Sequence, residues 1–323
     1  MIKHVKTLAA CLSALLLAGC AASPTHAPTT TRYHVAMIAK STSTEFWSAV
    51  FAGAEAAATE YNMDLTITGS ESEEDYSAQN DLIEKAVEEG AQAIIFSASD
   101  YQQNAAAIDA AADKGVRIVV VDSAVNSSKV SAYVGADNYG AGQMAAKSAL
   151  ENVEGPLHVG LVNYNVNSPN AQEREKGVID TLTASGRAEV AATVYSVATP
   201  ESARAETLTM LARHPEINVL ISFNEAVSVG AAQAVSDLNR ADDLWMVAFD
   251  SNIKTVDALH TGAVDAMVVQ NTYGMGYFSV ESAYKLLAGQ GNDVARETQT
   301  ATRIIDRSNI FALDGQKAVF PFE

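Results

Sequence analysis

Beyond residue 32, short apolar runs alternate with longer segments in which apolar residues recur at helical spacing. Residues 33–39 form the first apolar run, and residues 45–61 follow with apolar positions 46, 50, 54, 57 and 61 on one helical face. A run that is apolar throughout is typical of a strand buried on both faces of a sheet. The alternation therefore predicts βαβ units, in which helices cover both faces of parallel sheets.

The same pattern continues along the chain and sets the expected number of elements. Strands are predicted at residues 33–39, 63–68, 91–96, 116–121, 132–135, 157–162, 190–195, 219–223, 245–249, 264–269 and 300–305. Helices are predicted at residues 45–61, 75–89, 100–114, 170–184, 201–213, 225–238, 252–259 and 274–287. One sheet of about ten parallel strands would be unusually wide, so we expect an α/β protein of two lobes, each with about five strands.

The first twenty residues have the composition of an export signal. A basic start at residues 3–6 precedes an apolar segment at 8–18 that is too short to span a bilayer as a permanent helix. The sequence Leu-Ala-Gly-Cys at 17–20 resembles the lipobox of bacterial lipoproteins, which implies cleavage before Cys20 and a lipid on its thiol. An ordinary signal peptide that contains a cysteine is the alternative.

These features predict three segments and a location. We expect a lipoprotein signal peptide at residues 1–19, a flexible tether at 20–32 and the folded lobes from residue 33 onward. The protein is then exported and anchored by lipid to the bacterial membrane, where it faces the periplasm or the cell exterior.

Composition and charge exclude several classes of function. The net charge is −18 with only 21 Lys and Arg residues, which argues against nucleic acid as a partner. The two cysteines are Cys11 and Cys20, so the mature body is expected to fold without a disulfide. The six histidines lack the spacing of metal ligands, and we predict neither a metal site nor a cofactor. The acidic run at 71–75 is interpreted as a solvated loop.

Polar side chains follow most of the predicted strands. Ligands of parallel α/β sheets bind beyond the carboxyl ends of the strands, so these positions form the candidate site. Carboxylates, amides, hydroxyls and aromatic rings suit a polyhydroxylated ligand, whose hydroxyls need donors and acceptors and whose apolar faces need rings. The strand-end residues are Lys40, Ser97, Asp122, Ser123, Asn138, Tyr164, Asn165, Asn224, Asp250 and Gln270.

Several segments, taken in their order and spacing, resemble one family. They are STSTEFWSAVFAGAEAAA at 41–58, IIFSASD at 94–100, VVVDS at 119–123, VGADNYGAGQMAA at 134–146, NAQEREKG at 170–177, FNEAVSVGA at 223–231, VAFDSN at 247–252 and the strand that ends at Gln270. With these landmarks the chain resembles the type I periplasmic sugar-binding proteins of bacterial ABC importers, and most closely the ribose-binding branch.

The resemblance implies the arrangement of the lobes. Each lobe is expected to be Rossmann-like with a parallel sheet, and a three-strand hinge joins the two. The crossings are expected near residues 136–137, 270–271 and 305–306. The amino-terminal lobe would then contain residues 33–136 plus 271–305, and the carboxy-terminal lobe residues 137–270 plus 306–323.

The resemblance also implies roles for individual residues. Phe46 and Trp47 match an aromatic pair that sandwiches the sugar; the alternative is core packing beneath the first helix, which suits Phe46 better than Trp47. Arg174 matches an arginine whose planar fork grips ligand oxygens, and its alternative is a solvated charge on a helix. The strand-end residues that match family positions for sugar hydroxyls are Asp122, Asn224, Asp250 and Gln270.

Some positions depart from the ribose-binding pattern. Ser123 stands where an arginine follows the carboxylate, Ser97 where an asparagine is usual, and Lys40 where a small neutral residue is usual. A lysine at this strand end is also similar to the branch that binds the furanosyl signal autoinducer-2. Lys40 either contacts the ligand or forms an ion pair with Asp122 or Asp250. We therefore predict a sugar or a sugar-like polyol as ligand, and not ribose specifically.

The predicted function is binding, not catalysis. We expect a monomeric solute-binding lipoprotein that delivers its ligand to an ABC permease by hinge closure. The alternative is a sensing subunit that presents the ligand to a sensor kinase or a chemoreceptor. A remote alternative is an NAD-binding oxidoreductase, because Gly140-Ala-Gly-Gln-Met-Ala145 matches G-x-G-x-x-A, although glycines at a hinge crossing explain this match equally well.

Overall fold

The computed structural model describes residues 32–320 of the chain. The predicted signal peptide, the lipidation at Cys20 and nearly all of the predicted tether lie outside the described residues. Within residues 32–320, no helix combines the length and the apolarity that crossing a membrane requires.

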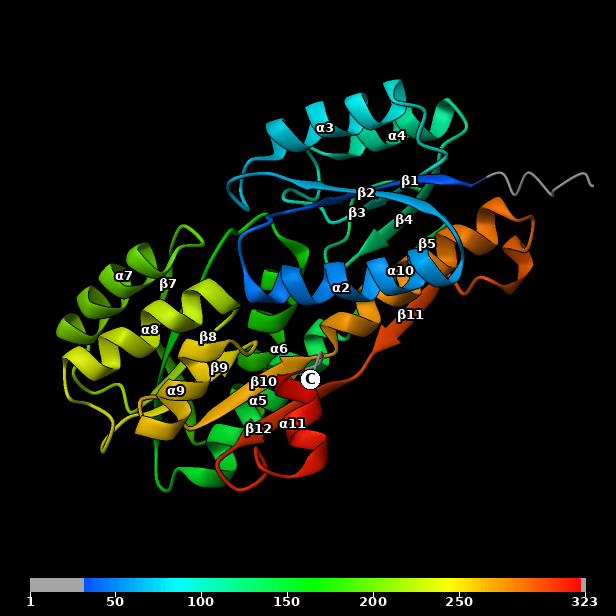
Figure 1. The fold of residues 1–323 in the computed structure, drawn as a ribbon. Coiled ribbons are helices and arrows are strands. Elements are labelled where there is room, and N and C mark those ends of the chain that lie inside the picture. The colour runs from blue at the N-terminus through cyan, green and yellow to red at the C-terminus, as the bar shows by residue number, and fades with distance from the viewer. Residues whose placement is uncertain (1–31, 321–323) are drawn as a thin grey trace, which may run out of the picture. The chain divides into compact units, whose positions relative to one another are not determined.

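The first lobe is built on a parallel sheet with the strand order β11-β5-β4-β3-β1-β2. Helices α2 (Glu45–Glu60) and α10 (Thr272–Leu287) cover one face, and α3 (Tyr76–Glu88) and α4 (Ala105–Asp113) cover the other (Figure 1). Met37 packs with the first helix pair and its neighbour Ile38 with the second, as expected of a strand buried on both faces. The strands are β1 (His34–Ala39), β2 (Asp64–Gly69), β3 (Ala93–Phe96), β4 (Arg117–Val121), β5 (Ala132–Ala136) and β11 (Glu297–Thr300).

The second lobe repeats this plan with the order β12-β10-β9-β8-β6-β7. All its strand pairs are parallel except β10 with β12, which is antiparallel. The strands are β6 (Leu157–Asn163), β7 (Ala188–Tyr195), β8 (Val219–Ser222), β9 (Trp245–Phe249), β10 (Ala266–Gln270) and β12 (Thr302–Asp306). The helices of this lobe are α5 (Asn138–Asn152), α6 (Pro169–Ser185), α7 (Pro200–Arg213), α8 (Glu225–Asp237), α9 (Ile253–Thr261) and α11 (Leu313–Val319). A short 3₁₀ helix, η2 (Gly291–Asp293), precedes β11 of the first lobe.

The chain passes between the two lobes at three places. It leaves the first sheet after β5, returns after β10 to form α10, and crosses again between β11 and β12. The third crossing was expected near residues 305–306, which is wrong. β11 pairs with β5 and β12 pairs with β10, so the passage lies at Ala301 and residues 302–305 belong to the second lobe. Each described sheet also has six strands, because the predicted strand at 300–305 is the meeting point of two.

Gly142, the second glycine of the 140–145 motif, serves the packing of two helices. A Cβ atom on Gly142 of α5 would lie 2.1 Å from the carbonyl oxygen of Arg174 on α6, a separation that no side chain tolerates. Gly177 of α6 approaches the carbonyl oxygen of Tyr139 equally closely. The motif therefore brings α5 against α6 and fixes the backbone position of Arg174.

Candidate ligand-binding site

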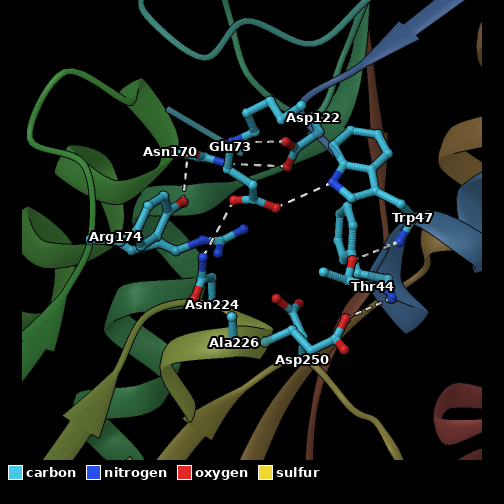
Figure 2. Close-up of a pocket in the computed structure, with 13 residues that line it drawn as sticks. Thr44, Trp47, Glu73, Asp122, Asn170, Arg174, Asn224, Ala226 and Asp250 are labelled. Carbon is cyan, nitrogen blue, oxygen red and sulfur yellow. Dashed lines mark hydrogen bonds and ion pairs between the residues drawn. The ribbon is translucent and has the colours of Figure 1, made fainter. Parts of the chain in front are cut away.

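The carboxyl ends of strands from both lobes meet at one pocket with a volume of about 20 Å³ (Figure 2). This volume is far below the roughly 300–1,000 Å³ that is usual for ligand pockets, so the two lobes are closely apposed here. Seven of the eleven predicted ligand-binding residues line it: Lys40, Phe46, Trp47, Asp122, Arg174, Asn224 and Asp250. The other lining residues are Thr44, Glu73, Tyr164, Asn170, Glu225 and Ala226.

Asp122 and Lys40 form a buried ion pair on the first-lobe wall. The Lys40 Nζ atom lies 3.5 Å from Asp122 Oδ2, and both side chains are only 4% exposed. Ser97 Oγ donates to the same oxygen at 3.1 Å, and Asn170 Nδ2 of the second lobe donates to Oδ1 at 3.1 Å. Burial is the largest effect and opposes the charged ammonium, but the attractions of Asp122, Tyr164 and Glu73 together outweigh it, and the pKa of Lys40 is raised. Of the two roles left open for Lys40, the ion pair with Asp122 is thus present, and the lysine also borders the pocket.

Asp250 is the corresponding carboxylate of the second lobe. It is 5% exposed, and its Oδ1 atom accepts a hydrogen bond of 2.7 Å from Gln270 Nε2. Burial raises the pKa of Asp250 to about 6, against the opposing effects of Arg174 and Gln270. Gln270 itself does not line the pocket, so its role in this arrangement is to orient the Asp250 carboxylate through their hydrogen bond.

Arg174 reaches the pocket from α6 and is 2% exposed, so the alternative of a solvated helix charge is wrong. Its Nε atom donates to Asn138 Oδ1 at 2.9 Å, and Nη1 donates to the carbonyl oxygen of Phe223 at 2.7 Å. The guanidinium carbon lies 4.8 Å above the centre of the Phe249 ring. These contacts hold the fork rigidly at the floor of the pocket.

The two aromatic residues differ from their expected ranking. Trp47 is 1% exposed and belongs to the first-lobe core, where its ring stacks on Phe51 at 6.0 Å and 27°. Its indole Nε1 edge reaches the pocket and donates to Glu73 Oε1 at 3.3 Å. Phe46 is only partly buried and meets the Trp47 ring edge-on at 5.2 Å. The helix thus turns Trp47 into the core and leaves Phe46 as the more accessible ring.

Three further predicted residues do not line the pocket: Ser97, Ser123 and Asn165. Ser97 is buried and donates to Asp122, as described above. Ser123 is buried, and its hydroxyl finds no hydrogen-bond partner among the described residues. Asn165 donates from Nδ2 to the carbonyl oxygen of Ser99 at 2.9 Å and so links the two lobes.

Glu73 is the main residue that the sequence interpretation missed. The run at 71–75 was expected to be a solvated loop, but the Glu73 side chain enters the pocket between Trp47 and Asn224 (Figure 2). Its neighbour Glu74 accepts from the backbone N–H of Ala198 in the second lobe at 3.1 Å. The acidic composition of residues 71–75 does not predict that Glu73 enters the pocket, because such a run is equally compatible with a loop exposed to solvent.

Tyr164, one of the strand-end residues of the candidate site, also lines the pocket, and beside it lies Asn170, which the sequence interpretation did not single out. Tyr164 donates from its hydroxyl to Asn170 Oδ1 at 2.9 Å, which aims the Asn170 amide at Asp122. Both residues were visible in the sequence, Tyr164 at a strand end and Asn170 at the head of the NAQEREKG segment. Their hydrogen bond, which a sequence does not show, turns them into a unit.

Carboxylates at helix starts also bridge the lobes beside the pocket. Glu225 of α8 accepts from the backbone N–H groups of Glu45 and Phe46 on α2, at 3.2 and 2.7 Å. In return, the Glu45 carboxylate accepts from the backbone N–H of Ile253 on α9 at 3.2 Å. Helix amino termini attract negative charge, so each carboxylate is placed where the partner lobe stabilises it.

Comparison with known proteins gives the following matches. A sequence model described as periplasmic binding protein domain matches residues 35–291. The D-ribose/D-allose-binding protein of Pseudomonas aeruginosa is 31% identical over 121 residues, 38% of this chain and 38% of that protein. The chain thus matches little more than a third of the length of this curated relative.

Two solved structures match over most of the chain. A sugar transporter from Clostridium phytofermentans is 30% identical, with a TM-score of 0.78 over 85% of this chain and 100% of that chain. A carbohydrate transporter solute binding protein from Agrobacterium radiobacter, in complex with D-arabinose, is 22% identical. Its TM-score is 0.86 over 90% of this chain and 100% of that chain, a likeness of fold.

Proposed function

Because this chain belongs to the periplasmic binding protein domain family, we propose that it captures a monosaccharide or related polyol outside the cytoplasm and delivers it to an ABC importer. The curated relative is a D-ribose/D-allose-binding protein, and the Clostridium relative is a sugar transporter. The family is one of binding proteins, and the proposed role is accordingly capture and release without catalysis.

The pocket between the lobes is the observation that carries this proposal. It offers the carboxylates of Asp122 and Asp250, the amides of Asn170 and Asn224 and the guanidinium of Arg174 around one small volume. Paired acceptors and donors of this kind match hydroxyl groups, each of which both donates and accepts. The Phe46 ring at the wall supplies an apolar surface for a sugar face.

Delivery requires that the pocket opens and closes. The three crossings form a natural hinge, and polar contacts between the lobes surround the pocket at Glu74, Asn165 and Glu225. A ligand that contacts both walls stabilises the closed arrangement and thereby shifts the hinge equilibrium. The closed surfaces of both lobes would then dock on the permease.

The first test is isothermal titration of the purified protein with a panel of neutral monosaccharides and polyols. Asp250→Ala should reduce the affinity of the ligand found by at least about tenfold, because a buried carboxylate that accepts from hydroxyls contributes about 1.5–3 kcal/mol. Asp243→Asn, an exposed carboxylate paired with Arg240, is the matched control and should leave affinity unchanged. Unchanged affinity in Asp250→Ala would remove this pocket as the binding site.

The membrane anchor is tested separately. We propose that Cys20 carries a diacylglycerol group that holds the protein at the membrane surface. Cells fed a labelled fatty acid should incorporate the label into the wild type and not into Cys20→Ala, which should be released from the membrane fraction. Labelling of Cys20→Ala would refute lipidation at this position without affecting the binding proposal.

A further inference from the structure

The pocket is more acidic than a neutral sugar requires. Its charged lining residues are four carboxylates and two cations, a net charge of −2 when all are ionised: Glu73, Asp122, Glu225 and Asp250 against Lys40 and Arg174. Asp122 and Asp250 are buried, and Glu73 and Glu225 are partly buried. Charges removed from water are stable only when they are paired or hydrogen-bonded, so each group must be assigned its partners.

Two of the four carboxylates, Asp122 and Glu225, accept from several donors of the protein, and Asp250 accepts from one. Asp122 receives the Lys40 ammonium and the donors from Ser97 and Asn170. Glu225 receives two backbone N–H groups of α2 and the Asn252 amide at 3.0 Å. Asp250 receives Gln270 and lies in the field of Arg174.

Glu73 is held differently. The two groups that donate to it are neutral, the Trp47 indole at 3.3 Å and the Asn224 amide at a long 3.5 Å. The Lys40 ammonium is already paired with Asp122, and two Arg174 nitrogens donate to Asn138 and to a backbone carbonyl. Burial raises the pKa of Glu73, and the attraction of Lys40 does not offset it. Glu73 is therefore the carboxylate of the four that is held by the longest hydrogen bonds, and its donors carry no charge.

We infer that the pocket selects a monosaccharide or polyol that carries a protonated amino group, and that Glu73 is the residue that pairs with this group. An ammonium beside Glu73 brings the charge of the filled pocket closer to neutrality. The Trp47 and Asn224 contacts already aim the carboxylate into the pocket from the 71–75 loop (Figure 2). This inference rests on the proposed sugar-binding function and narrows its ligand class.

The test compares sugars that differ by one amino group. D-Glucose, D-galactose and D-mannose are titrated beside their 2-amino-2-deoxy counterparts and the neutral N-acetyl forms, with D-ribose as a further neutral sugar. At least one amino sugar should bind about tenfold more tightly than its neutral parent, the effect expected of a hydrogen bond to a charged group. N-acetylation removes the charge and should abolish this advantage.

Variants assign the effect to Glu73. Glu73→Gln keeps the size and the acceptor oxygen but removes the charge, so the preference for the amino form should fall to about threefold or less. Glu71→Gln is the control, because it lies in the same loop but is exposed and does not line the pocket. Thermal unfolding of all three proteins checks that the variants are folded.

The outcomes separate this inference from the function on which it rests. Three results would each overturn the inference of an amino group while sugar binding stands. They are neutral sugars that bind as tightly as their amino forms, binding of D-ribose without binding of any amino sugar, and an unchanged preference for the amino form in Glu73→Gln. If no sugar in the series binds saturably, both the inferred amino group and the proposed sugar-binding function are overturned.

Discussion

At the scale of single residues, Asp122 and Asp250 occupy equivalent positions in the two lobes. Each follows a strand with a positive φ, 62° and 65°, and each donates its backbone N–H to the neighbouring strand at 2.9 Å. A left-handed backbone costs a residue with a side chain about 1–2 kcal/mol, although Asp tolerates it better than most. The strain is repeated where both carboxylates enter the pocket, which supports a functional reason for it.

The raised pKa of Asp250 predicts how stability depends on pH. In the folded protein its pKa is about 6, whereas an unfolded Asp titrates near 3.9. Protonated Asp250 stabilises the folded protein relative to the form in which this carboxylate is ionised. This contribution is fully present below about pH 4 and is lost as the pH rises through 6. In the ligand-free protein at pH 7.5, Asp250→Asn should therefore increase the free energy of unfolding by about 1–3 kcal/mol.

Urea denaturation at two pH values checks this prediction. The gain from Asp250→Asn should shrink at pH 4.5, where the folded wild type is already protonated at this position. Asp243→Asn, on the surface, should show no gain at either pH. A less stable Asp250→Asn protein at pH 7.5 would contradict the proposed cost of the buried charge. The same variant should bind ligand more weakly, so stability and function oppose each other here.

The aromatic pair gives a second prediction at this scale. Trp47→Ala empties a core position and should lower the free energy of unfolding by about 3–5 kcal/mol. Phe46→Ala removes a partly buried ring at the pocket wall, so it should cost about 1–2 kcal/mol but reduce ligand affinity about tenfold. Chemical denaturation and titration separate the two effects. If Phe46→Ala binds normally, the ring has no part in ligand contact.

At the scale of elements, the starts of α2, α8 and α9 form the main polar contact between the lobes. Glu225 accepts from two N–H groups of α2, and Glu45 accepts from the Ile253 N–H of α9. Each carboxylate lies in the first turn of its own helix, so the same residue also suits its own helix terminus. The reciprocal arrangement should favour lobe closure whichever ligand is bound.

Glu45 tests this contact best, because it does not line the ligand pocket. Glu45→Ala should reduce ligand affinity about two- to fivefold through weaker closure, and the stability of the ligand-free protein should change by less than about 0.5 kcal/mol. Glu55→Ala lies on the exposed side of the same helix and serves as the control. Equal affinities of Glu45→Ala and the control would show that the contact does not contribute to closure.

Element boundaries show what periodicity can and cannot predict. The helix expected from Asp100 begins instead at Ala105, because the Asp100 carboxylate accepts from the N–H groups of Gln102 and Gln103 and holds a turn. The single strand expected at 300–305 is two strands that join different sheets. A local pattern marks an extended segment but does not specify the sheet with which it pairs.

At the scale of the whole molecule, the family resemblance and the fold class predicted from the sequence are confirmed. The alternation of strands and helices predicted the fold class, and the order and spacing of the landmark segments carried the family resemblance. The proposed site was less predictable where a loop or a hydrogen-bond network determines it. Glu73 enters from an acidic loop without periodicity, and Gln270 was expected at the ligand but supports Asp250.

Closure of the two lobes around the ligand should change the overall dimensions of the protein. Ligand contacts both walls, so saturating ligand should lower the radius of gyration in small-angle X-ray scattering toward the value calculated from the present structure. The Glu45→Ala/Glu225→Ala protein should reach the same compact state only at higher ligand concentration, because fewer polar contacts hold the lobes together. A radius that stays constant while titration shows binding would mean that the ligand enters without closure, and delivery would then need another signal than the hinge.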